Sequence, residues 1–497
     1  MKRREFLKYG SAGLTLPFWL QYCDFPGTSY PVSLHSDHHT GHLLFQSTNW
    51  KAVRIDAIEV AIVGGGLAGL AAAHQLGETN FQVFELSDSF GGTVSTASFD
   101  GVQFSQGAHY DLAYPDHYGE EVISLLDALN LIKYEPWKRA WSFKDQQHLI
   151  PSFRKQQCYD FGNRRKDVIP ESLLKNQFVD LMLQYDGEMR MPTRLINTQY
   201  ATLNDISFSD FLRSELPITS DFLQQVNYHM YDDYGGDASM VSALAGIHYF
   251  TCRPYYTQDV PLFSPPNGNR YFADAMINKM NPGRLRSSCL VKSIRKDGEG
   301  FELEIVNIRK QVVEEVRARS VIYAGQKHAL KYVYPEQASL FETTYAPWMV
   351  VNLITQQKTG VYGHWQNEFL GKNPSFLGFI DSSVQSQASL NGKRVFTGYY
   401  CLSPSDRQYL IAVADSKESI ARETQGYVEE MLETSIDVEG CCIKVMGHAM
   451  PIPAPGYLLK DANNASNAEM IYAGVDNGKL PLLYEALDSG LQAASLI

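Results

Sequence analysis

The chain has 497 residues, of which 44% are hydrophobic and 20% are charged, and its formal net charge at pH 7 is −12. This length is too great for one typical core and predicts two or more domains. An acidic chain is a poor partner for a phosphate backbone, so the composition argues against nucleic-acid binding. No stretch is long and apolar enough to predict a stable transmembrane segment.

The first residues, MKRREFLK, resemble the core of a twin-arginine export signal. Arg3 and Arg4 precede an apolar stretch, Gly10–Leu20, which is shorter than the about 20 residues needed to span a bilayer. A basic region followed by an apolar one is the order of a signal, although no small-residue cleavage site follows. We expect residues 1–30 to direct export by the twin-arginine translocase, to the periplasm or another extracytoplasmic space. Whether the signal is cleaved stays open.

Residues 31–56 are polar and rich in histidine, with the run LHSDHHTGHLL at their centre. Such crowding could bind a metal, but no predicted element fixes its geometry, so we expect an exposed linker and no metal site. The seven cysteines lack the paired spacing of a zinc site. In an exported protein one or two long-range disulfides remain possible, and the sequence does not pair them.

The first strong pattern is IEVAIVGGGLAGLAAAHQLGETNFQVFEL, from Ile58 to Leu86. The apolar run Ile58–Val63 predicts a buried strand, Leu70–Leu76 a small-residue helix and Phe81–Glu85 a second strand. A glycine-rich turn, Gly-x-Gly-x-x-Gly, connects the first strand to the helix. Strand, glycines, helix, strand and terminal acid in this order predict a dinucleotide-binding βαβ unit.

Each residue of the turn has a role in such a unit. Gly64 permits the tight turn, Gly66 lets the backbone approach a diphosphate, and Gly69 allows the helix to pack closely on the strand. Leu67 and Ala68 stand at the start of the helix, where free N–H groups face the diphosphate. Glu85 follows 19 residues after Gly66, where its carboxylate can accept hydrogen bonds from the adenosine ribose.

The residues that follow resemble the flavin-containing amine oxidase superfamily, which includes monoamine and polyamine oxidases, phytoene desaturases and protoporphyrinogen oxidases. The resemblance begins with Ser89-Phe90-Gly91-Gly92-Thr93-Val94 after Glu85, and continues with Gly107-Ala108-His109-Tyr110 and a helix that ends near Leu131. Further blocks are PPNGNRYFADAMINKM, CLVKSIRKDGEGFELEI, ARSVIYAG and the closing MIYAGVDNGKLPLLYEALDSGLQAASLI.

The resemblance covers roughly residues 57–497 and implies non-covalent FAD in an α/β fold, with a Rossmann-like FAD-binding domain interleaved with a mixed α+β substrate domain. It implies an FAD-binding domain at 57–150, 265–345 and 440–497, and a substrate domain at 151–264 and 346–439. Beyond the turn and Glu85, the residues that it assigns to the cofactor are Leu86, Ser87, Gly91, Gly92, Thr93, Gly107, Ala108, His109, Val291, Ala324, Gly474 and Asp476.

Two departures from the family pattern bear on the reaction. In amine-oxidising members a lysine holds a water near the flavin, and Asn352 stands at the matching place here. The aromatic residue that precedes the last helix in monoamine oxidases falls at Leu482, with Tyr484 two places on. These differences argue against the familiar catalytic arrangement and leave FAD binding intact.

Three residues are candidates for catalysis: His109, Asn352 and His448. His109 follows the Gly107-Ala108 turn, and histidine is the natural acid or base near neutral pH; a structural hydrogen-bonding role is the alternative. His448 lies in a Pro-rich loop before the closing block. The apolar segment Ser242–Arg253 contains further aromatic residues that could line a pocket or belong to the core.

The sequence thus predicts an FAD-dependent oxidoreductase, amine oxidase-like, that removes hydride from a C–N or C–C bond of a small organic substrate. Its electron acceptor would be oxygen or another molecule. The alternatives are a flavin-dependent desaturase or isomerase, and a flavin-binding accessory protein without turnover.

Overall fold

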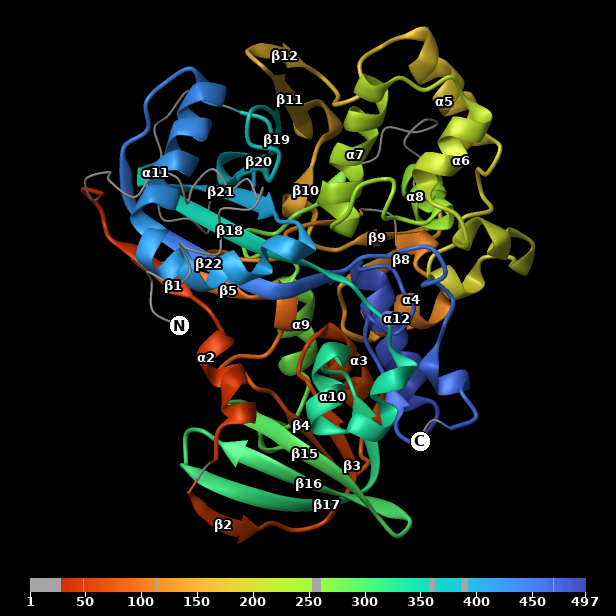
Figure 1. Cartoon of the computed structure of the whole chain (residues 1–497), viewed down its shortest axis with the longest axis vertical. Coiled ribbons are helices and arrows are strands. Elements are labelled where there is room, and N and C mark those ends of the chain that lie inside the picture. Colours follow the sequence, from red (N-terminus) through yellow and green to blue (C-terminus); the bar gives the residue numbers. More distant parts are fainter. Residues whose placement is uncertain are drawn as a thin grey trace, which may run out of the picture.

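The computed structural model of the chain describes residues 28–47, 49–112, 115–252, 261–356, 363–385, 392–467 and 469–497. Nearly all of the predicted export signal, residues 1–30, lies outside this part. Figure 1 shows the described chain as two large sheets, one at the lower end of the molecule and one at the upper left, with a group of helices at the upper right.

The lower sheet contains the predicted βαβ unit. Its strand order is β14-β4-β3-β17-β16-β15, and β2 and β23 also pair with β17. The strands are β2 (Lys51–Arg54), β3 (Ile58–Val63), β4 (Phe81–Phe84), β14 (Leu285–Arg286), β15 (Cys289–Asp297), β16 (Gly300–Asn307), β17 (Val312–Tyr323) and β23 (Ile471–Tyr472). Because β3 runs parallel to both β4 and β17, the ends of these strands meet at one edge of the sheet.

Helix α3 (Leu67–Leu76) follows β3 and begins earlier than predicted. It ends at Gly77, whose φ of 55° favours glycine. The C-terminal helix α12 (Leu483–Ala494) packs directly on α3. A Cβ atom at Gly490 would lie 2.1 Å from the carbonyl oxygen of Ala68, so the two helices approach this closely only because position 490 has no side chain.

The upper sheet has the order β1-β22-β18-β21-β20-β19-β11-β12. Its strands are β1 (Val32–His35), β11 (Gln156–Asp160), β12 (Asn163–Arg165), β18 (Tyr345–Gln356), β19 (Gln366–Leu370), β20 (Phe376–Asp381), β21 (Lys393–Cys401) and β22 (Val438–Pro451). Most of these strands come from the segments assigned to the substrate domain, and β22 adds residues that the sequence placed in the FAD-binding domain.

The prediction of a linker at 31–56 was wrong. β1 pairs in parallel with β22 over four residue pairs, from Val32 with Cys441 to His35 with Lys444. β2 pairs in parallel with β17. The segment was misread because a four-residue strand at a sheet edge has too few residues to show a period. The segment therefore contributes one strand to each sheet.

Alternation along the upper strands gives this sheet two different faces. One face carries Met349, Val351 and Phe396, which pack with the long helix α11 (Val413–Leu432) in one apolar cluster. The opposite face carries Asn352 and Thr397, among other polar and aromatic residues. Polar groups on this buried face must find hydrogen-bond partners inside the molecule.

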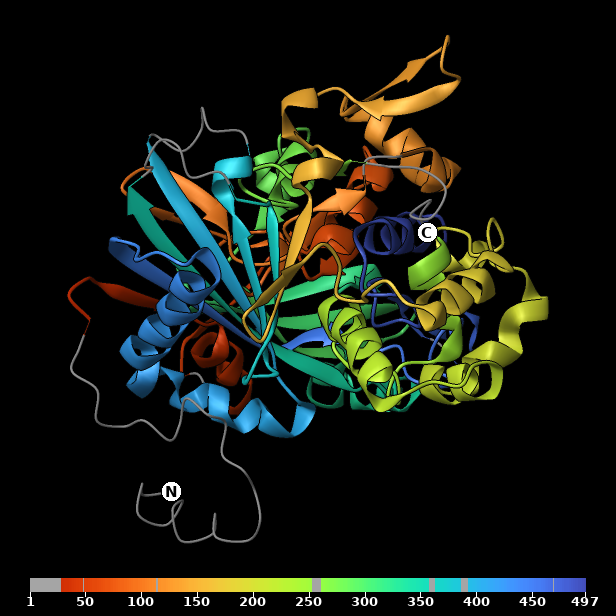
Figure 2. The same ribbon diagram turned by 90° about the horizontal axis from the view of Figure 1, so that it is seen from above.

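The helices at the upper right cover that second face. They are α5 (Leu173–Leu183), α6 (Phe208–Glu215), α7 (Ser220–Tyr234) and α8 (Ala243–Thr251). Figure 2, seen from above, shows them on the side of the upper sheet opposite to α11. Their buried residues join one large apolar cluster with Trp348, Tyr399 and Cys401 of the sheet.

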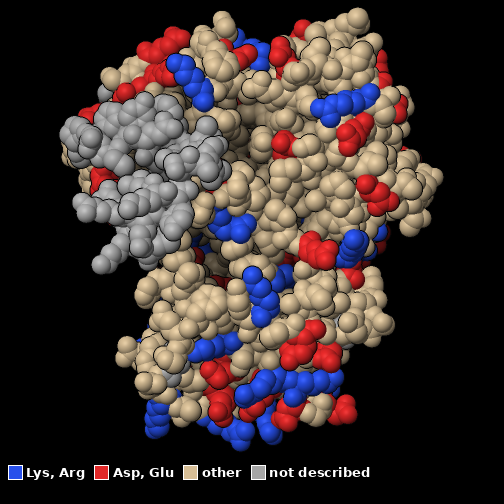
Figure 3. All heavy atoms as spheres, viewed as in Figure 1, with Lys and Arg blue, Asp and Glu red and all other residues tan. Residues whose placement is uncertain are grey.

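Shorter elements complete the fold. They are α2 (His38–Gly41), α4 (Glu120–Ala128), α9 (Arg270–Ile277), α10 (Leu330–Val333), β5 (Thr96–Phe99), β6 (Val102–Ser105), β7 (Asp111–Leu112), β8 (Ile132–Glu135), β9 (Ala140–Phe143), β10 (Leu149–Ile150) and β13 (Leu262–Phe263). Within the described ranges, no helix has both the length and the apolar character that crossing a membrane requires. Figure 3 shows acidic and basic side chains intermixed over the lower part of the molecule on this face.

Candidate active site

The glycine-rich turn has the geometry that a dinucleotide requires. Gly64 adopts a φ of 105°, and a Cβ atom there would lie 2.8 Å from the backbone of Ala324 at the end of β17. A Cβ atom at Gly69 would lie 2.0 Å from the carbonyl oxygen of Gly64. At Gly66 the nearest atom to such a Cβ is the Cα of Gly92, at 3.9 Å. Gly64 and Gly69 are therefore required by the fold, whereas Gly66 leaves a space beside the helix start at Leu67 and Ala68.

The second glycine pair lies against the first turn. The Gly91 amide donates to the carbonyl of Gly65 at 2.8 Å. Gly92 has a φ of 61°, and a Cβ atom there would lie 3.2 Å from the Cα of Gly66. Gly92 and Thr93 are exposed. The two turns thus form a joint backbone surface without side chains, at the N-terminus of α3, which is the kind of surface that accepts a diphosphate.

The acid at the end of the second strand supports this surface. Glu85 is buried, and its carboxylate accepts hydrogen bonds from the amides of Gly65 at 2.7 Å and Ser87 at 2.8 Å. Burial raises the pKa of Glu85, and these hydrogen bonds oppose the rise. Each carboxylate oxygen can accept a second hydrogen bond, so the predicted contact with a ribose fits this arrangement. Leu86 and Ser87 are half-buried beside it.

The next predicted block continues from the second glycine pair. The Ala108 amide donates to the carbonyl of Thr93 at 3.1 Å. A Cβ atom at Gly107 would lie 1.8 Å from that same carbonyl oxygen, so only glycine fits. Ala108 is exposed beside it. Val291 lies further away, buried on β15 in the apolar cluster that contains Phe84.

The closing block meets the end of β17 through a buried ion pair. Nζ of Lys327 lies 2.9 Å from Oδ1 of Asp476, and the backbone amide of Lys327 donates to Oδ2 at 2.8 Å. Tyr345 donates to the same Oδ2 at 2.7 Å. Lys327 also donates to the carbonyls of Gly325 and Ala473. A Cβ atom at Gly474 would lie 3.1 Å from both members of the pair, so glycine leaves room for it.

The sequence placed Asp476 and Gly474 at the cofactor and gave no signal for Lys327. Asp476 has its carboxylate engaged by Lys327 and Tyr345, so its first role is to fix the closing turn. The residues assigned to the cofactor from Gly64 to Gly107, together with Ala324, lie in contiguous contact. This glycine-lined, acid-supported surface fits FAD, with its diphosphate at α3 and its ribose at Glu85.

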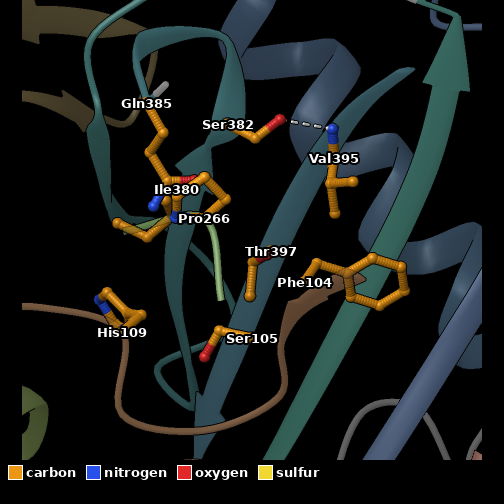
Figure 4. Close-up of a pocket in the computed structure, with 9 residues that line it drawn as sticks. All are labelled: Phe104, Ser105, His109, Pro266, Ile380, Ser382, Gln385, Val395 and Thr397. Carbon is orange, nitrogen blue, oxygen red and sulfur yellow. Dashed lines mark hydrogen bonds between the residues drawn. The ribbon is translucent and has the colours of Figure 1, made fainter. Parts of the chain in front are cut away.

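A pocket lies between the Gly107 block and the upper sheet. Its lining residues are Phe104, Ser105, His109, Pro266, Ile380, Ser382, Gln385, Val395 and Thr397. Figure 4 shows His109, Ser105 and Thr397 around the same space, His109 and Ser105 from the chain that carries the Gly107 block and Thr397 from β21. The pocket therefore lies where the cofactor-binding block meets the substrate-side sheet.

His109 is enclosed by aromatic rings. Its ring stacks on Tyr399 with centroids 5.1 Å apart and lies 5.6 Å from Trp365. Nε2 of His109 is 3.5 Å from the Tyr399 hydroxyl. Burial lowers the pKa of His109 to about 4, against a smaller opposing effect of a hydrogen bond to the Gly107 backbone. His109 is therefore a neutral imidazole at neutral pH.

Asn352 is fully buried, and its amide is saturated by neighbours. Nδ2 donates to the carbonyl of Ser105 and to the hydroxyl of Thr397, both at 3.0 Å. Oδ1 accepts from Nε2 of Gln106 at 3.2 Å. Asn352 was predicted as a catalytic residue, but with no exposed surface it cannot touch a substrate directly. Its role is to position the groups around it.

His448 lies away from this pocket. Its ring stacks on His328 with centroids 3.6 Å apart and meets the edge of Tyr345. Burial lowers the pKa of His448 to about 3, and the neighbouring His328 adds to this effect. His448 is thus adjacent to the Lys327–Asp476 pair through Tyr345, not to His109.

Two other features of the sequence have structural roles. Within the aromatic segment at Ser242–Arg253, residues Ala243–Thr251 form α8, and His248, Tyr249 and Phe250 are all buried in the helical core. Arg253 lies outside the described residues. In the histidine-rich run, no group of metal-binding side chains is found among the described residues. Cys158, Cys289, Cys401, Cys441 and Cys442 are free thiols.

Comparison with known proteins bears on the family of the chain. The family model of flavin containing amine oxidoreductase matches residues 67–443, well over half of the chain. The chain belongs to this family. It is an FAD-dependent oxidoreductase of amine oxidase-like type, as the resemblance implied. No curated protein sequence matches the chain significantly.

Solved structures share the fold at low identity. A candidate protoporphyrinogen oxidase from Exiguobacterium sp. 255-15 has a TM-score of 0.62 at 15% identity, covering 89% of this chain and 99% of its own. A double mutant of putrescine oxidase, redesigned in its cofactor binding, has 0.61 at 14%, covering 89% and 99%. Cyclohexylamine oxidase from Brevibacterium oxydans IH-35A has 0.61 at 13%, covering 89% and 98%.

Proposed function

We propose that this oxidoreductase removes hydride from a C–N bond of a small amine and that the substrate binds beside His109. The observation that carries the proposal is the neutral, half-buried His109, stacked on Tyr399 at 5.1 Å and adjoining the Gly107-Ala108 block. Two fold relatives, putrescine oxidase and cyclohexylamine oxidase, carry an amine in their names. Their identity to this chain is too low to transfer a substrate, so the proposal rests on the surroundings of His109.

The chemistry divides between the cofactor and the chain. FAD, when bound, accepts the hydride. An amine reaches the site as an ammonium ion, and it must lose a proton before its C–H bond can give up hydride. His109 has a pKa of about 4 and is neutral above roughly pH 5, so its lone pair can accept a hydrogen bond from the ammonium N–H and it adds no charge that would repel the ammonium. The proton itself passes to solvent, because an imidazole with this pKa is too weak a base to keep it.

The aromatic residues around His109 supply position and exclude water. Tyr399 and Trp365 are buried and hold the imidazole from two sides. Trp365 is fixed in turn because its indole N–H donates to Ser264 at 3.1 Å. A substrate carbon held beside His109 would be shielded from solvent by these rings, and this geometry favours hydride transfer over side reactions.

A second candidate is removal of hydride from a C–C bond, as in a desaturase. It is supported by Asn352, which stands at the position of the lysine in amine-oxidising members and is sealed inside the sheet. A pocket in which a sealed amide replaces that lysine would suit an apolar substrate better than an amine. The two candidates differ in whether His109 contacts a substrate nitrogen.

Anaerobic reduction of the purified, FAD-loaded protein tests the proposal. We expect one member of a panel of mono-, di- and polyamines to bleach the flavin absorption. His109→Gln should slow that reduction roughly 100-fold, because the amide does not reproduce the position of the imidazole nitrogen and the substrate is misplaced. His117→Gln, a change at an exposed histidine, is the matched control. If an apolar alkene precursor reduces the flavin and no amine does, the proposal of hydride removal from a C–N bond is wrong and the second candidate is favoured.

We also propose that the protein acts outside the cytoplasm after export in a folded state. The support is the Arg3-Arg4 motif together with the FAD site, whose parts come from segments hundreds of residues apart. Such a site can hold its cofactor only after folding, and a route for folded proteins suits a cofactor that is loaded before export.

A further inference from the structure

A chain of hydrogen bonds connects the N-terminal strand β1 to the pocket. Nδ1 of His35 lies 2.7 Å from Oε1 of Gln106. Nε2 of Gln106 donates to Oδ1 of Asn352 at 3.2 Å. Asn352 then donates to Ser105 O and Thr397 Oγ1. Gln106 and Asn352 are buried, so water does not substitute for these partners.

The direction of every bond in this chain is fixed by one acceptor. The backbone carbonyl of Ser105 can only accept, so it requires Nδ2 of Asn352 on its side. Oδ1 of Asn352 then requires Nε2 of Gln106, which leaves Oε1 of Gln106 facing His35. His35 therefore carries a hydrogen on Nδ1. A single arrangement of donors satisfies all four residues.

The same logic fixes the hydroxyl of Thr397. An amide nitrogen does not accept, so Thr397 Oγ1 accepts from Asn352 at 3.0 Å and keeps its own hydrogen for another partner. Within the described part of the chain, no acceptor for that hydrogen is found. Thr397 lines the pocket beside His109 and Ser105, as Figure 4 shows.

We propose that Thr397 donates a hydrogen bond to the group that occupies this pocket, and that His35, Gln106 and Asn352 are positioning residues that aim it. The inference rests on the proposed function in that the occupant is part of the reacting substrate–flavin pair. It gives β1 a role in the site, although this strand precedes the βαβ unit and lies before the residues that match the family model.

β1 is held firmly enough for this role. Besides its pairing with β22, the carbonyl of Val32 accepts from Nζ of Lys417 at 2.9 Å. The carboxylate of Asp37 lies 3.0 Å from Nζ of Lys444. The Tyr30 hydroxyl donates to Gln425 at 2.9 Å. These contacts come from β22 and α11, so the position of His35 depends on the upper sheet and its helix.

The test compares Thr397→Val, which removes the hydroxyl at nearly constant shape, with Thr397→Ser, which keeps it. In the FAD-loaded full chain we expect Thr397→Val to slow anaerobic flavin reduction by the best amine roughly 100-fold. Thr397→Ser should restore most of the rate. Thr355→Val is the matched control, because Thr355 is a buried strand threonine whose hydroxyl donates to the backbone carbonyl of Arg394 at 3.3 Å.

The positioning residues are tested by a double-variant comparison. His35→Ala should slow flavin reduction in the wild-type background, and His35→Asn, whose amide can still donate to Gln106, should slow it less. In the Thr397→Val background His35→Ala should have no further effect, because it acts only through Thr397. If His35→Ala slows flavin reduction equally in both backgrounds, the proposed chain of hydrogen bonds from His35 to Thr397 is wrong. If Thr397→Val reduces its flavin at the wild-type rate, the proposed role of Thr397 is wrong.

A failure of the proposed function is distinguishable from a failure of this inference. If no amine reduces the flavin of the wild-type protein, the proposal of hydride removal from a C–N bond is wrong. The visible absorption spectrum of the bound flavin then provides the second readout. A spectrum shifted in Thr397→Val and restored in Thr397→Ser would support the hydroxyl as a donor in the pocket. Identical spectra in all three proteins would reject it.

Discussion

Nζ of Lys327 lies 2.9 Å from Oδ1 of Asp476, and both side chains are buried beside Gly474. The pair joins the end of β17 to the closing block, two segments that each contribute a residue assigned to the cofactor. Breaking a buried ion pair by removing one partner leaves an uncompensated charge. The position of the closing turn therefore depends on both residues.

Replacement of Lys327 by Met should destabilise the protein by about 3–5 kcal/mol and weaken FAD retention. Lys331→Met, at an exposed lysine in the same segment, should change neither quantity. Thermal unfolding and the ratio of flavin to protein absorbance measure the two effects. ADP binding to the FAD-free protein provides a control and should be unchanged in Lys327→Met. ADP would use the surface at Gly66 and Glu85, which is remote in sequence from this pair. Full flavin content in Lys327→Met would show that the pair does not hold the closing turn.

Two glycines of the same turn should respond differently to alanine. A methyl group at Gly66 meets no atom closer than 3.9 Å, so the variant should fold with nearly unchanged stability and lose FAD affinity by roughly tenfold or more. A methyl group at Gly69 would lie 2.0 Å from a carbonyl oxygen, and overpacking of this kind costs about 1–3 kcal/mol. Unfolding in urea and flavin titration separate the outcomes. Equal stability loss in both variants would contradict the assignment.

The stability contributed by three buried histidines should fall as the pH decreases from about 6.5 to about 4. Burial lowers the pKa of His109 and His328 to about 4, and that of His448 to about 3, from an ordinary value near 6.5. In this window these three histidines bind more protons in the unfolded chain than in the folded one, so the stability that their neutral forms confer is complete above pH 6.5 and is lost on acidification. Urea midpoints measured between pH 4 and 7 test this. His448→Gln should reduce the slope of the urea midpoint against pH. An unchanged slope would show that His448 does not contribute to the pH dependence of stability in this window.

The predicted export route can be tested without the described structure. Arg3→Lys combined with Arg4→Lys should leave active, FAD-loaded protein in the cytoplasm, because the twin-arginine route recognises the paired arginines. Cell fractionation with flavin fluorescence of the purified protein measures the distribution. Lys2→Arg, a neighbouring basic change that keeps the pair, is the control. Continued export of the double variant would show that the Arg3-Arg4 pair is not the export signal.

The sequence alone determined the βαβ unit and most of the cofactor surface. Gly64, Gly66, Gly69 and Glu85 lie within one window of the chain, and their order follows from the strand–turn–helix–strand geometry that a diphosphate requires. The family resemblance then assigned Gly91, Gly107 and Ala324 to the cofactor, and the structure brings them beside the same turn. It also assigned Gly474, which lies against the Lys327–Asp476 pair. Patterns of this kind can be recognised in a sequence because each glycine satisfies a local steric requirement.

Only the tertiary structure determined which polar side chains of the site lie next to one another. Lys327 and Asp476 are 149 residues apart, and Gln106 and Asn352 are 246 apart. Asn352 changed from a catalytic candidate to a positioning residue because strand alternation turned its side chain into the interior of the sheet. β1 was read as a linker because its four residues gain their structure from β22, not from any period of their own. Contacts between distant segments depend on sheet register and packing, which no local pattern encodes.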